Sequence, residues 1–320
     1  MSLFDGYAAL AVDLDGVVYR GPTAVPYAVA ALEAANVPVL FATNNASRPP
    51  ADVATHLSHL GLSCSAADVV TSSQAGAWLL TERLTPGAAV LAVGGPGVAQ
   101  SLTEAGFVSV DPAQGPGHEV SAVLQGYGPE VRAADLAEAA YAIQRGAIWV
   151  ATNTDGTLPT DRGVAPGNGT LIAAVQRAVG RPPSLVAGKP QTPIYDLVAR
   201  RLGVSPSTVL AIGDRLDTDI EGAVSAGMDS LLVLTGVDDL DAALTAPIGR
   251  RPTYVLPDLS WVGSDRWPGP SRGASGAESE ELTAAVRAVW QWRDAHGEQA
   301  PELAGLRHHA QETLERMRRG

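Results

Sequence analysis

Residues 7–16 read YAALAVDLDG, a short apolar run that stops at two aspartates and a glycine. Val37–Ala42 is a second apolar run and stops at Thr43, while a third, Val209–Ile212, leads into GDRLDTDI at residues 213–220. Stretches rich in helix-forming residues separate these runs. Continuous apolar strands that alternate with helices are typical of a parallel sheet covered on both faces. We therefore predict an α/β fold built on a parallel sheet.

The same alternation continues along the chain and predicts two α/β units. Further strands are expected at residues 89–93, 120–124, 147–151, 185–187 and 230–234. The polar motifs at strand ends fall within residues 1–75 and 182–235, whereas Pro86–Gly180 has a strand–helix alternation of its own. We predict a core formed by residues 1–80 and 182–263, with a second α/β domain, residues 81–181, inserted between its two parts.

The end of the chain has a different pattern. Residues 264–277 are rich in Gly, Pro and Ser, which predicts a linker. Residues 278–320 carry apolar positions at helical spacing and predict a helical extension of two amphipathic helices. We expect this extension to pack on the core or on a second subunit, and a regulatory or partner-binding appendage is the alternative.

Composition limits the partners and the compartment. The 34 acidic residues outnumber the 22 basic ones, and a net charge of −12 makes nucleic acids and anionic membranes poor partners. The single cysteine, Cys64, excludes an internal disulfide and a multi-cysteine metal site. The long uncharged run Leu84–Thr103 contains two prolines and four glycines, so it does not predict a membrane span. We expect a soluble, cytoplasmic protein.

Acidic residues recur at two predicted strand ends. Asp13 and Asp15 follow the first strand, and alternation along an extended chain would direct both carboxylates the same way. Asp214 directly follows the strand at 209–212, and Asp219 lies near the start of the next helix. Neighbouring carboxylates attract a cation, and hard oxygen ligands suit Mg²⁺. Solvated turn aspartates and helix caps are the alternatives, but capping does not explain acids at two separate strand ends.

Two further features could bind an anion. Thr43, Asn44 and Asn45 end the second strand where a helix begins, and backbone N–H groups at such a position can hold a phosphate; capping is again the alternative. Lys189 is the only lysine among the 22 basic residues. A compact ammonium group there could neutralise a phosphate.

In this order, these four motifs resemble those of the haloacid-dehalogenase-like (HAD) superfamily of phosphatases. DLDG resembles the first motif, Thr43 the second, Lys189 the third and GDRLDTD the fourth. The wordings TNNAS and AGKP are similar to the NagD-like branch, which includes pyridoxal phosphate, phosphoglycolate and glycerol phosphate phosphatases. The resemblance covers roughly residues 5–260 and implies a Rossmann-like core with a large α/β cap inserted between the second and third motifs. Ala46 departs from the TNNSS wording that is frequent in the branch.

The resemblance implies hydrolysis of phosphate monoesters through an aspartyl phosphate. It implies that Asp13 is the nucleophile and that Asp15 is the general acid and base. Mg²⁺ would be held by the carboxylates of Asp13 and Asp214 and by the backbone carbonyl of Asp15, and Asp219 would orient Lys189 or a metal-bound water. The transferring phosphoryl group would be bound by Thr43, Asn44, Asn45 and Lys189.

The partner is then a small phosphorylated metabolite, with the leaving group contacted by the cap. Glycerol 3-phosphate is the first expectation, on branch membership and an aromatic content of 5%. Phosphoglycolate, pyridoxal phosphate and a nucleotide stay open, as does a homodimer through the cap or the C-terminal helices. Arg162 and Asn168 could face the substrate crevice. A phosphotransferase and a non-catalytic phosphate sensor are the alternatives from other functional classes.

Overall fold

The strand β1 (Ala9–Val12) is fully buried and pairs in parallel with β13 (Val209–Gly213) and with β4 (Val39–Thr43). Beyond β13, the parallel strands β14 (Asp229–Val233) and β15 (Tyr254–Leu256) extend the sheet. The resulting order is β15-β14-β13-β1-β4. A strand covered on both faces has no solvent side, and this explains why the apolar runs do not alternate with polar residues. The predicted α/β fold with a parallel sheet is confirmed.

The computed structural model describes all residues except 1, 115–118, 161, 264–277 and 320. The chain divides into two units, one of Met1–Phe41, Leu60–Ser63 and Ala199–Gly320, the other of Ala42–His59 and Cys64–Val198. The predicted linker at 264–277 lies outside the described residues. The division into a core of residues 1–80 and 182–263 and an inserted domain of residues 81–181 stays a prediction.

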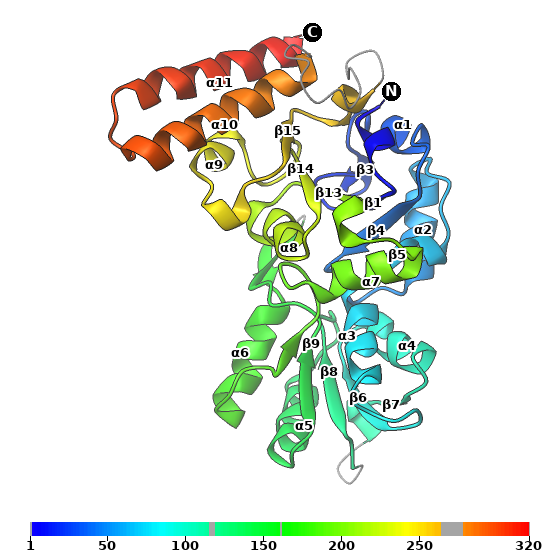
Figure 1. Ribbon diagram of the computed structural model, residues 1–320. Coiled ribbons are helices and arrows are strands. Elements are labelled where there is room, and N and C mark those ends of the chain that lie inside the picture. Colours follow the sequence, from blue (N-terminus) through cyan, green and yellow to red (C-terminus); the bar gives the residue numbers. More distant parts are fainter. Residues whose placement is uncertain (1, 115–118, 161, 264–277, 320) are drawn as a thin grey trace. The chain divides into compact units, whose positions relative to one another are not determined.

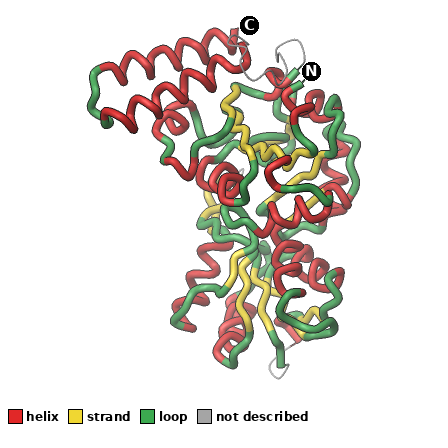
Figure 2. The backbone as a smooth tube through the Cα atoms, in the orientation of Figure 1, coloured by secondary structure: helices red, strands yellow, loops and turns green. Residues whose placement is uncertain are grey.

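The second unit contains its own five-stranded parallel sheet (Figures 1 and 2). Its strand order is β12 (Leu185–Val186), β9 (Ile148–Ala151), β8 (Ala122–Gln125), β6 (Ala89–Val93) and β7 (Val108–Val110). One face packs against α5 (Ala133–Gln144) and α6 (Asn168–Val179), the other against α3 (Ser72–Thr81) and α4 (Pro96–Glu104). A second α/β unit with its own core was predicted, and it is present.

The remaining elements of the second unit are shorter. β10 (Thr157–Thr160) and β11 (Gly163–Pro166) form an antiparallel hairpin. The unit also includes α2 (Pro50–His59) and β5 (Val69–Thr71). Helix α7 (Pro193–Leu202) begins in the second unit and ends in the first.

In the first unit, an antiparallel pair, β2 (Tyr19–Arg20) and β3 (Thr23–Ala24), follows β1 directly. The unit's short helices are α1 (Ala28–Glu33), α8 (Glu221–Ser225) and α9 (Leu240–Thr245).

The predicted helical extension is formed by α10 (Glu278–His296) and α11 (Glu302–Arg319), which pack against each other (Figure 2). Buried hydrogen bonds join helix α10 to the rest of the first unit. Trp290 donates its indole N–H to the carbonyl of Ala243 (2.8 Å), and the Thr283 hydroxyl accepts from the backbone N–H of Val255 (2.9 Å). The extension therefore packs on the first unit of its own chain. Packing on the core was one of the two arrangements expected from the sequence, and packing on a second subunit was the other. Within the described residues, no helix is long and apolar enough to cross a membrane.

Candidate active site

Three aspartates meet at the carboxyl ends of β1 and β13. The backbone N–H of Asp13 donates to the carbonyl of Ile212 (2.9 Å), so the pairing of the two strands continues up to Asp13. One carboxylate oxygen from each of Asp13, Asp214 and Asp219 lies within 4.8 Å of the others. Asp214 and Asp219 are only 2% and 3% exposed, and Asp13 is half-buried. Buried like charges at this separation repel one another, and a divalent cation with oxygen ligands would offset that repulsion.

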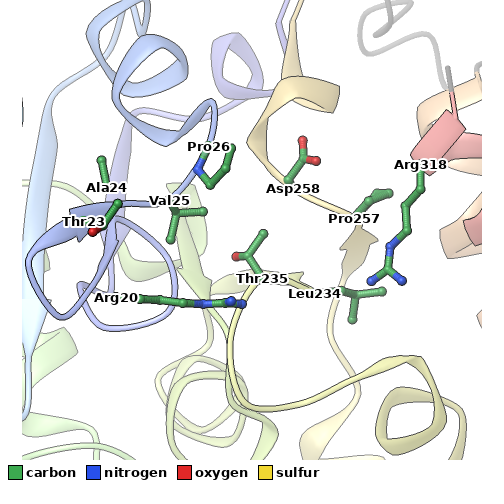
Figure 3. A pocket seen from close by; sticks show the side chains of 10 residues that line it. All are labelled: Arg20, Thr23, Ala24, Val25, Pro26, Leu234, Thr235, Pro257, Asp258 and Arg318. Carbon is green, nitrogen blue, oxygen red and sulfur yellow. The ribbon is translucent and has the colours of Figure 1, made fainter. Parts of the chain in front are cut away.

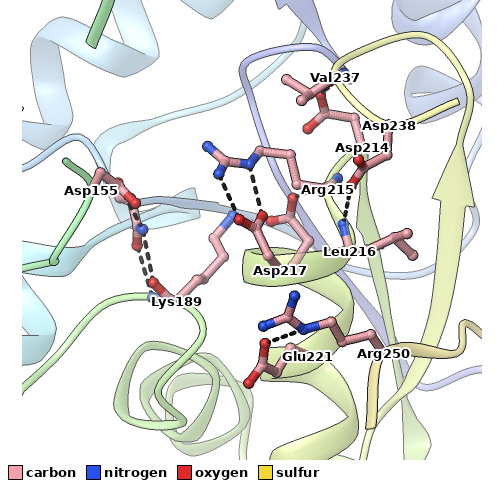
Figure 4. Close-up of polar contacts among 12 residues, drawn as sticks. Asp155, Lys189, Asp214, Arg215, Leu216, Asp217, Glu221, Val237, Asp238 and Arg250 are labelled. Atoms are coloured by element: carbon pink, nitrogen blue, oxygen red, sulfur yellow. Dashed lines mark hydrogen bonds and ion pairs between the residues drawn. The ribbon is translucent and has the colours of Figure 1, made fainter. Parts of the chain in front are cut away.

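The carboxylate of Asp214 is packed between two glycines. A β-carbon on Gly16 would lie 2.3 Å from its Oδ2 and one on Gly236 only 1.7 Å from it, so no side chain fits at either position. Gly16 also has a φ of +84°, which other residues rarely adopt. The backbone N–H of Val237 donates to the same Oδ2 (2.7 Å; Figure 4). These contacts fix the direction of the carboxylate.

Asp219 belongs to a short π-helical segment, Leu216–Ile220. Its Oδ2 accepts from the backbone N–H of Arg215 (3.2 Å), and a β-carbon on Gly213 would lie 2.1 Å from its own β-carbon. π-helical turns frequently occur at functional sites, where they redirect a side chain. The resemblance implied that Asp219 orients Lys189 or a metal-bound water. In the structure its carboxylate lies with those of Asp13 and Asp214, which makes it a candidate for direct contact with a cation.

Three other aspartates close to the cluster in the sequence lie in different environments. Asp217 is exposed and pairs with the guanidinium group of Arg215 (3.0 Å; Figure 4). The Asp238 carboxylate accepts from the backbone N–H of Leu216 (2.6 Å) and so holds the π-helical segment from outside. Asp15 is exposed and lies in the tight turn that joins β1 to β2. Among the described residues it is not one of the three clustered carboxylates, and its exposure suits a group that exchanges protons.

Thr43, Asn44, Asn45 and Lys189 belong to the second unit. The carboxamide of Asn44 accepts from the backbone N–H of Lys189 through Oδ1 (2.8 Å) and donates through Nδ2 to the Lys189 carbonyl (3.0 Å) and to Asp155 Oδ2 (3.1 Å). A β-carbon on Gly188 would lie 2.4 Å from that Oδ1, so the glycine permits the approach. Both polar ends of the Asn44 side chain are thus engaged within the protein. Its predicted part in phosphate binding stays a prediction.

The rest of this cluster is held by local bonds. The hydroxyl of buried Thr43 accepts from the backbone N–H of Asn45 (3.1 Å). The carboxamide of Asn45 in turn accepts from the backbone N–H (3.1 Å) and hydroxyl (2.8 Å) of Ser47, a turn typical of asparagine. Lys189 is 2% exposed, which is rare for a lysine and requires compensating partners.

Two expectations about the segment after β9 have different outcomes. Asn168 is 2% exposed, and its amide donates to the carbonyls of Asn153 (2.8 Å) and Gln125 (3.3 Å). It therefore fastens the interior of the second unit and does not face a crevice. Arg162 is exposed in the turn between β10 and β11.

Sequence reasoning missed several residues around these sites. Asp155, Gly236 and Asp238 were not singled out, although each comes a few residues after a predicted strand. Their position after a predicted strand was the signal that could have identified them. Their partners are distant in the sequence, so their contacts could not be inferred from it.

Comparison with known proteins identifies the family. The model of haloacid dehalogenase-like hydrolases matches residues 10–108, and a second HAD-hydrolase-like model matches residues 186–262. A D-glycerol 3-phosphate phosphatase from Mycobacterium tuberculosis is 45% identical over 266 residues, which are 82% of this chain and 73% of the relative. An acid sugar phosphatase from Staphylococcus aureus is 34% identical over 257 residues, 79% of this chain and 96% of the relative.

Comparison with solved structures points to the same family. A glycerol phosphate phosphatase from M. tuberculosis in complex with magnesium aligns with a TM-score of 0.78 at 38% identity, covering 98% of this chain and 92% of its own. A p-nitrophenyl phosphatase from Archaeoglobus fulgidus aligns with a TM-score of 0.72 at 27% identity, covering 79% and 97%. Together with the clustered aspartates at the strand ends, these matches confirm the resemblance: the chain belongs to the haloacid-dehalogenase-like hydrolases, in their NagD-like branch of phosphatases.

Proposed function

We propose that this chain is a Mg²⁺-dependent phosphatase of small phosphate monoesters that acts through an aspartyl phosphate. The observation that carries the proposal is the position of Asp13, a half-buried carboxylate at the end of β1 with the carboxylates of Asp214 and Asp219 beside it. This arrangement supports the proposal, because the mechanism requires a nucleophile next to a cation site. The M. tuberculosis and S. aureus relatives, which are named as phosphatases, support the assignment.

The chemistry follows from these groups. A carboxylate oxygen of Asp13 attacks phosphorus while the ester P–O bond breaks, and Asp15 gives a proton to the leaving alkoxide. Asp15 then takes a proton from the water that attacks the aspartyl phosphate, so inorganic phosphate is released and Asp13 is restored. The carboxylates of Asp13, Asp214 and Asp219, together with the backbone carbonyl of Asp15, would hold Mg²⁺. When bound, the ion offsets the negative charges that meet in the transition state. Phosphoryl binding by Thr43 and Lys189 rests on the order of the motifs.

Glycerol 3-phosphate is the proposed substrate. The 45% identical relative is named for it, and the structural relative solved with magnesium is named a glycerol phosphate phosphatase. A sugar phosphate is the second candidate, because the S. aureus relative is named an acid sugar phosphatase. We further propose that residues 81–181 form a cap that excludes water and contacts the leaving group.

The test is release of inorganic phosphate from a panel of monoesters, with Mg²⁺ and with EDTA. The panel contains glycerol 3-phosphate, phosphoglycolate, pyridoxal phosphate, a nucleoside monophosphate and sugar phosphates. We expect metal-dependent release, with the highest kcat/KM for glycerol 3-phosphate. No release from any ester by folded protein would contradict the phosphatase, and release only on addition of a second alcohol would identify a phosphotransferase.

Two further properties belong to this proposal. The acidic composition and the single cysteine support a cytoplasmic enzyme. A homodimer through the proposed cap, residues 81–181, or through the C-terminal helices is a hypothesis that light scattering on the eluting protein tests, since a dimer doubles the mass of the peak.

A further inference from the structure

A pocket of about 410 Å³ lies within the first unit (Figure 3). Its walls come from the β2–β3 hairpin, from the segments that follow β14 and β15, and from the last turn of α11. A volume of this size falls in the range of small-molecule sites, roughly 300–1,000 Å³. Arg318, the contribution of α11, lies outside the residues matched by the family models.

Two arginines give the pocket a positive charge. Arg20 reaches in from the hairpin and Arg318 from α11, and Figure 3 shows both side chains extending toward Leu234. In the part of the chain that the structure describes, neither guanidinium group has a hydrogen-bond or ion-pair partner. By contrast, the nearby Arg316 and Arg319 are paired with Glu281 and Glu315. In a protein with 34 acidic residues, two arginines on one pocket without a partner among the described residues are an unusual arrangement.

The acidic residue of the lining does not cancel this charge. Asp258 accepts from the backbone N–H of Ser260 (2.8 Å), where it caps the short helix that follows. In Figure 3 its carboxylate points away from the two guanidinium groups. A basic residue in the last turn of α11 also suits the helix dipole, but the dipole does not account for the direction of Arg318 into the pocket.

The remaining walls add a second property. Val25, Leu234 and Pro257 form an apolar surface, and the hydroxyl of Thr235 lies beside it. Arginine binds phosphate and carboxylate groups in a forked geometry, and apolar walls accommodate a carbon skeleton. We propose that this pocket is a binding site for a small anionic metabolite, whose phosphate or carboxylate group is held by Arg20 and Arg318.

None of the residues that line the pocket belongs to the aspartate cluster, and the pocket adjoins the turn that carries Asp15. The Thr235 hydroxyl donates to the carbonyl of Gly16 (2.8 Å), the residue after Asp15. The main chain of Asp15 forms an isolated β-bridge with that of Tyr19, the residue before Arg20. A ligand in the pocket thus contacts two elements bonded to that turn. The C-terminal extension gains a defined function, since α11 supplies one of the two arginines.

Calorimetry with two unreactive probes, sulfate and succinate, tests this site in the full-length protein. The titrations are done in EDTA, because without a cation the three aspartates repel anions and binding reports on the arginine pocket. We expect the wild type to bind at least one probe. Tighter binding of sulfate indicates a phosphate ligand, and tighter binding of succinate indicates a carboxylate ligand. Arg20→Gln and Arg318→Gln should each weaken that binding about tenfold or more, which corresponds to the loss of a charged hydrogen bond.

Arg319→Gln is the matched control, since it removes a neighbouring arginine that is paired with Glu315, and it should bind like the wild type. Binding of these probes in EDTA requires neither Mg²⁺ nor turnover, so failure of this proposal and failure of the phosphatase are told apart. Equal binding by all variants, or no binding of either probe by the wild type, would overturn the proposal of an anion site. Circular dichroism verifies that each variant is folded.

Discussion

The side chain of Asn44 holds the main chain of Lys189 at both its polar groups. The carboxamide accepts from the Lys189 N–H at 2.8 Å and donates to the Lys189 carbonyl at 3.0 Å, although 145 positions separate the two residues. Two hydrogen bonds to one residue restrict both its position and its rotation. We propose that Asn44 is a positioning residue for Lys189, whose ammonium group is proposed above to bind phosphate.

Asn44→Ala tests this relationship. The substitution removes both bonds to Lys189 and the bond to Asp155, so we expect the free energy of unfolding to fall by about 1–3 kcal/mol. We also expect kcat to fall more than KM rises, because a displaced ammonium group weakens mainly the transition state. Asn36→Ala is the matched control, because the exposed Asn36 side chain donates a hydrogen bond to Asp5 at the surface. A variant with normal kcat would show that Asn44 serves stability alone.

Asp13→Asn separates turnover from stability. Removing the attacking charge should lower kcat by about 10³-fold or more. In EDTA the same variant should unfold at a higher temperature than the wild type, because one of three carboxylates within 4.8 Å loses its charge. Phosphate release and thermal unfolding measure the two effects. Substantial residual turnover would remove Asp13 as nucleophile, and a lower Tm in EDTA would argue against repulsion in the cluster.

Mg²⁺ should stabilise the folded protein through the same cluster. A ligand that binds only the folded state at 100 times its Kd adds about 2.7 kcal/mol to the free energy of unfolding. We expect a rise in Tm with Mg²⁺ that EDTA reverses. Asp214→Asn should abolish the rise, because Asp214 is buried in the cluster. Asp217→Asn, in the same segment but exposed and paired with Arg215, should keep it. An equal response from both variants would place the metal elsewhere.

The attachment of the C-terminal helices should depend on pH through Asp294. Hydrogen bonds from Arg251 (2.5 and 2.7 Å) hold the pKa of Asp294 below its usual range. A lowered carboxyl pKa contributes stability above the unfolded pKa, about 3.9, that is lost as pH falls through the folded value. Asp294→Asn should therefore unfold at lower urea than the wild type at pH 7, and the difference should shrink below about pH 4.

Glu298→Gln is the control for that experiment, because Glu298 is exposed on the same helical hairpin. It should leave the urea midpoint unchanged at both pH values. A difference between Asp294→Asn and the wild type that is equally large at pH 7 and at pH 3 would exclude the ion pair as its cause.

Local patterns in the sequence predicted much of the fold. The apolar runs at 89–93 and 209–212 became β6 and the first four residues of β13, because a strand buried on both faces must be apolar throughout. Asp219 was expected near the start of a helix, but the segment around it is the π-helical segment Leu216–Ile220, which precedes α8. Hydrophobic spacing does not report such a change, since it depends on the bonds of Asp219 and Arg215.

The sequence alone therefore determined the α/β class and the family, since both are expressed in short strings such as DLDG and GDRLDTD, and the same strings contain the residues proposed to carry the chemistry. Only the tertiary structure decided which of these residues meet. It placed Asp219 with Asp13 and Asp214, packed Gly16 and Gly236 against one carboxylate, and brought Arg20 and Arg318 to one pocket. The reason is that a local pattern reports burial along one element, whereas proximity depends on strand order and packing between distant segments.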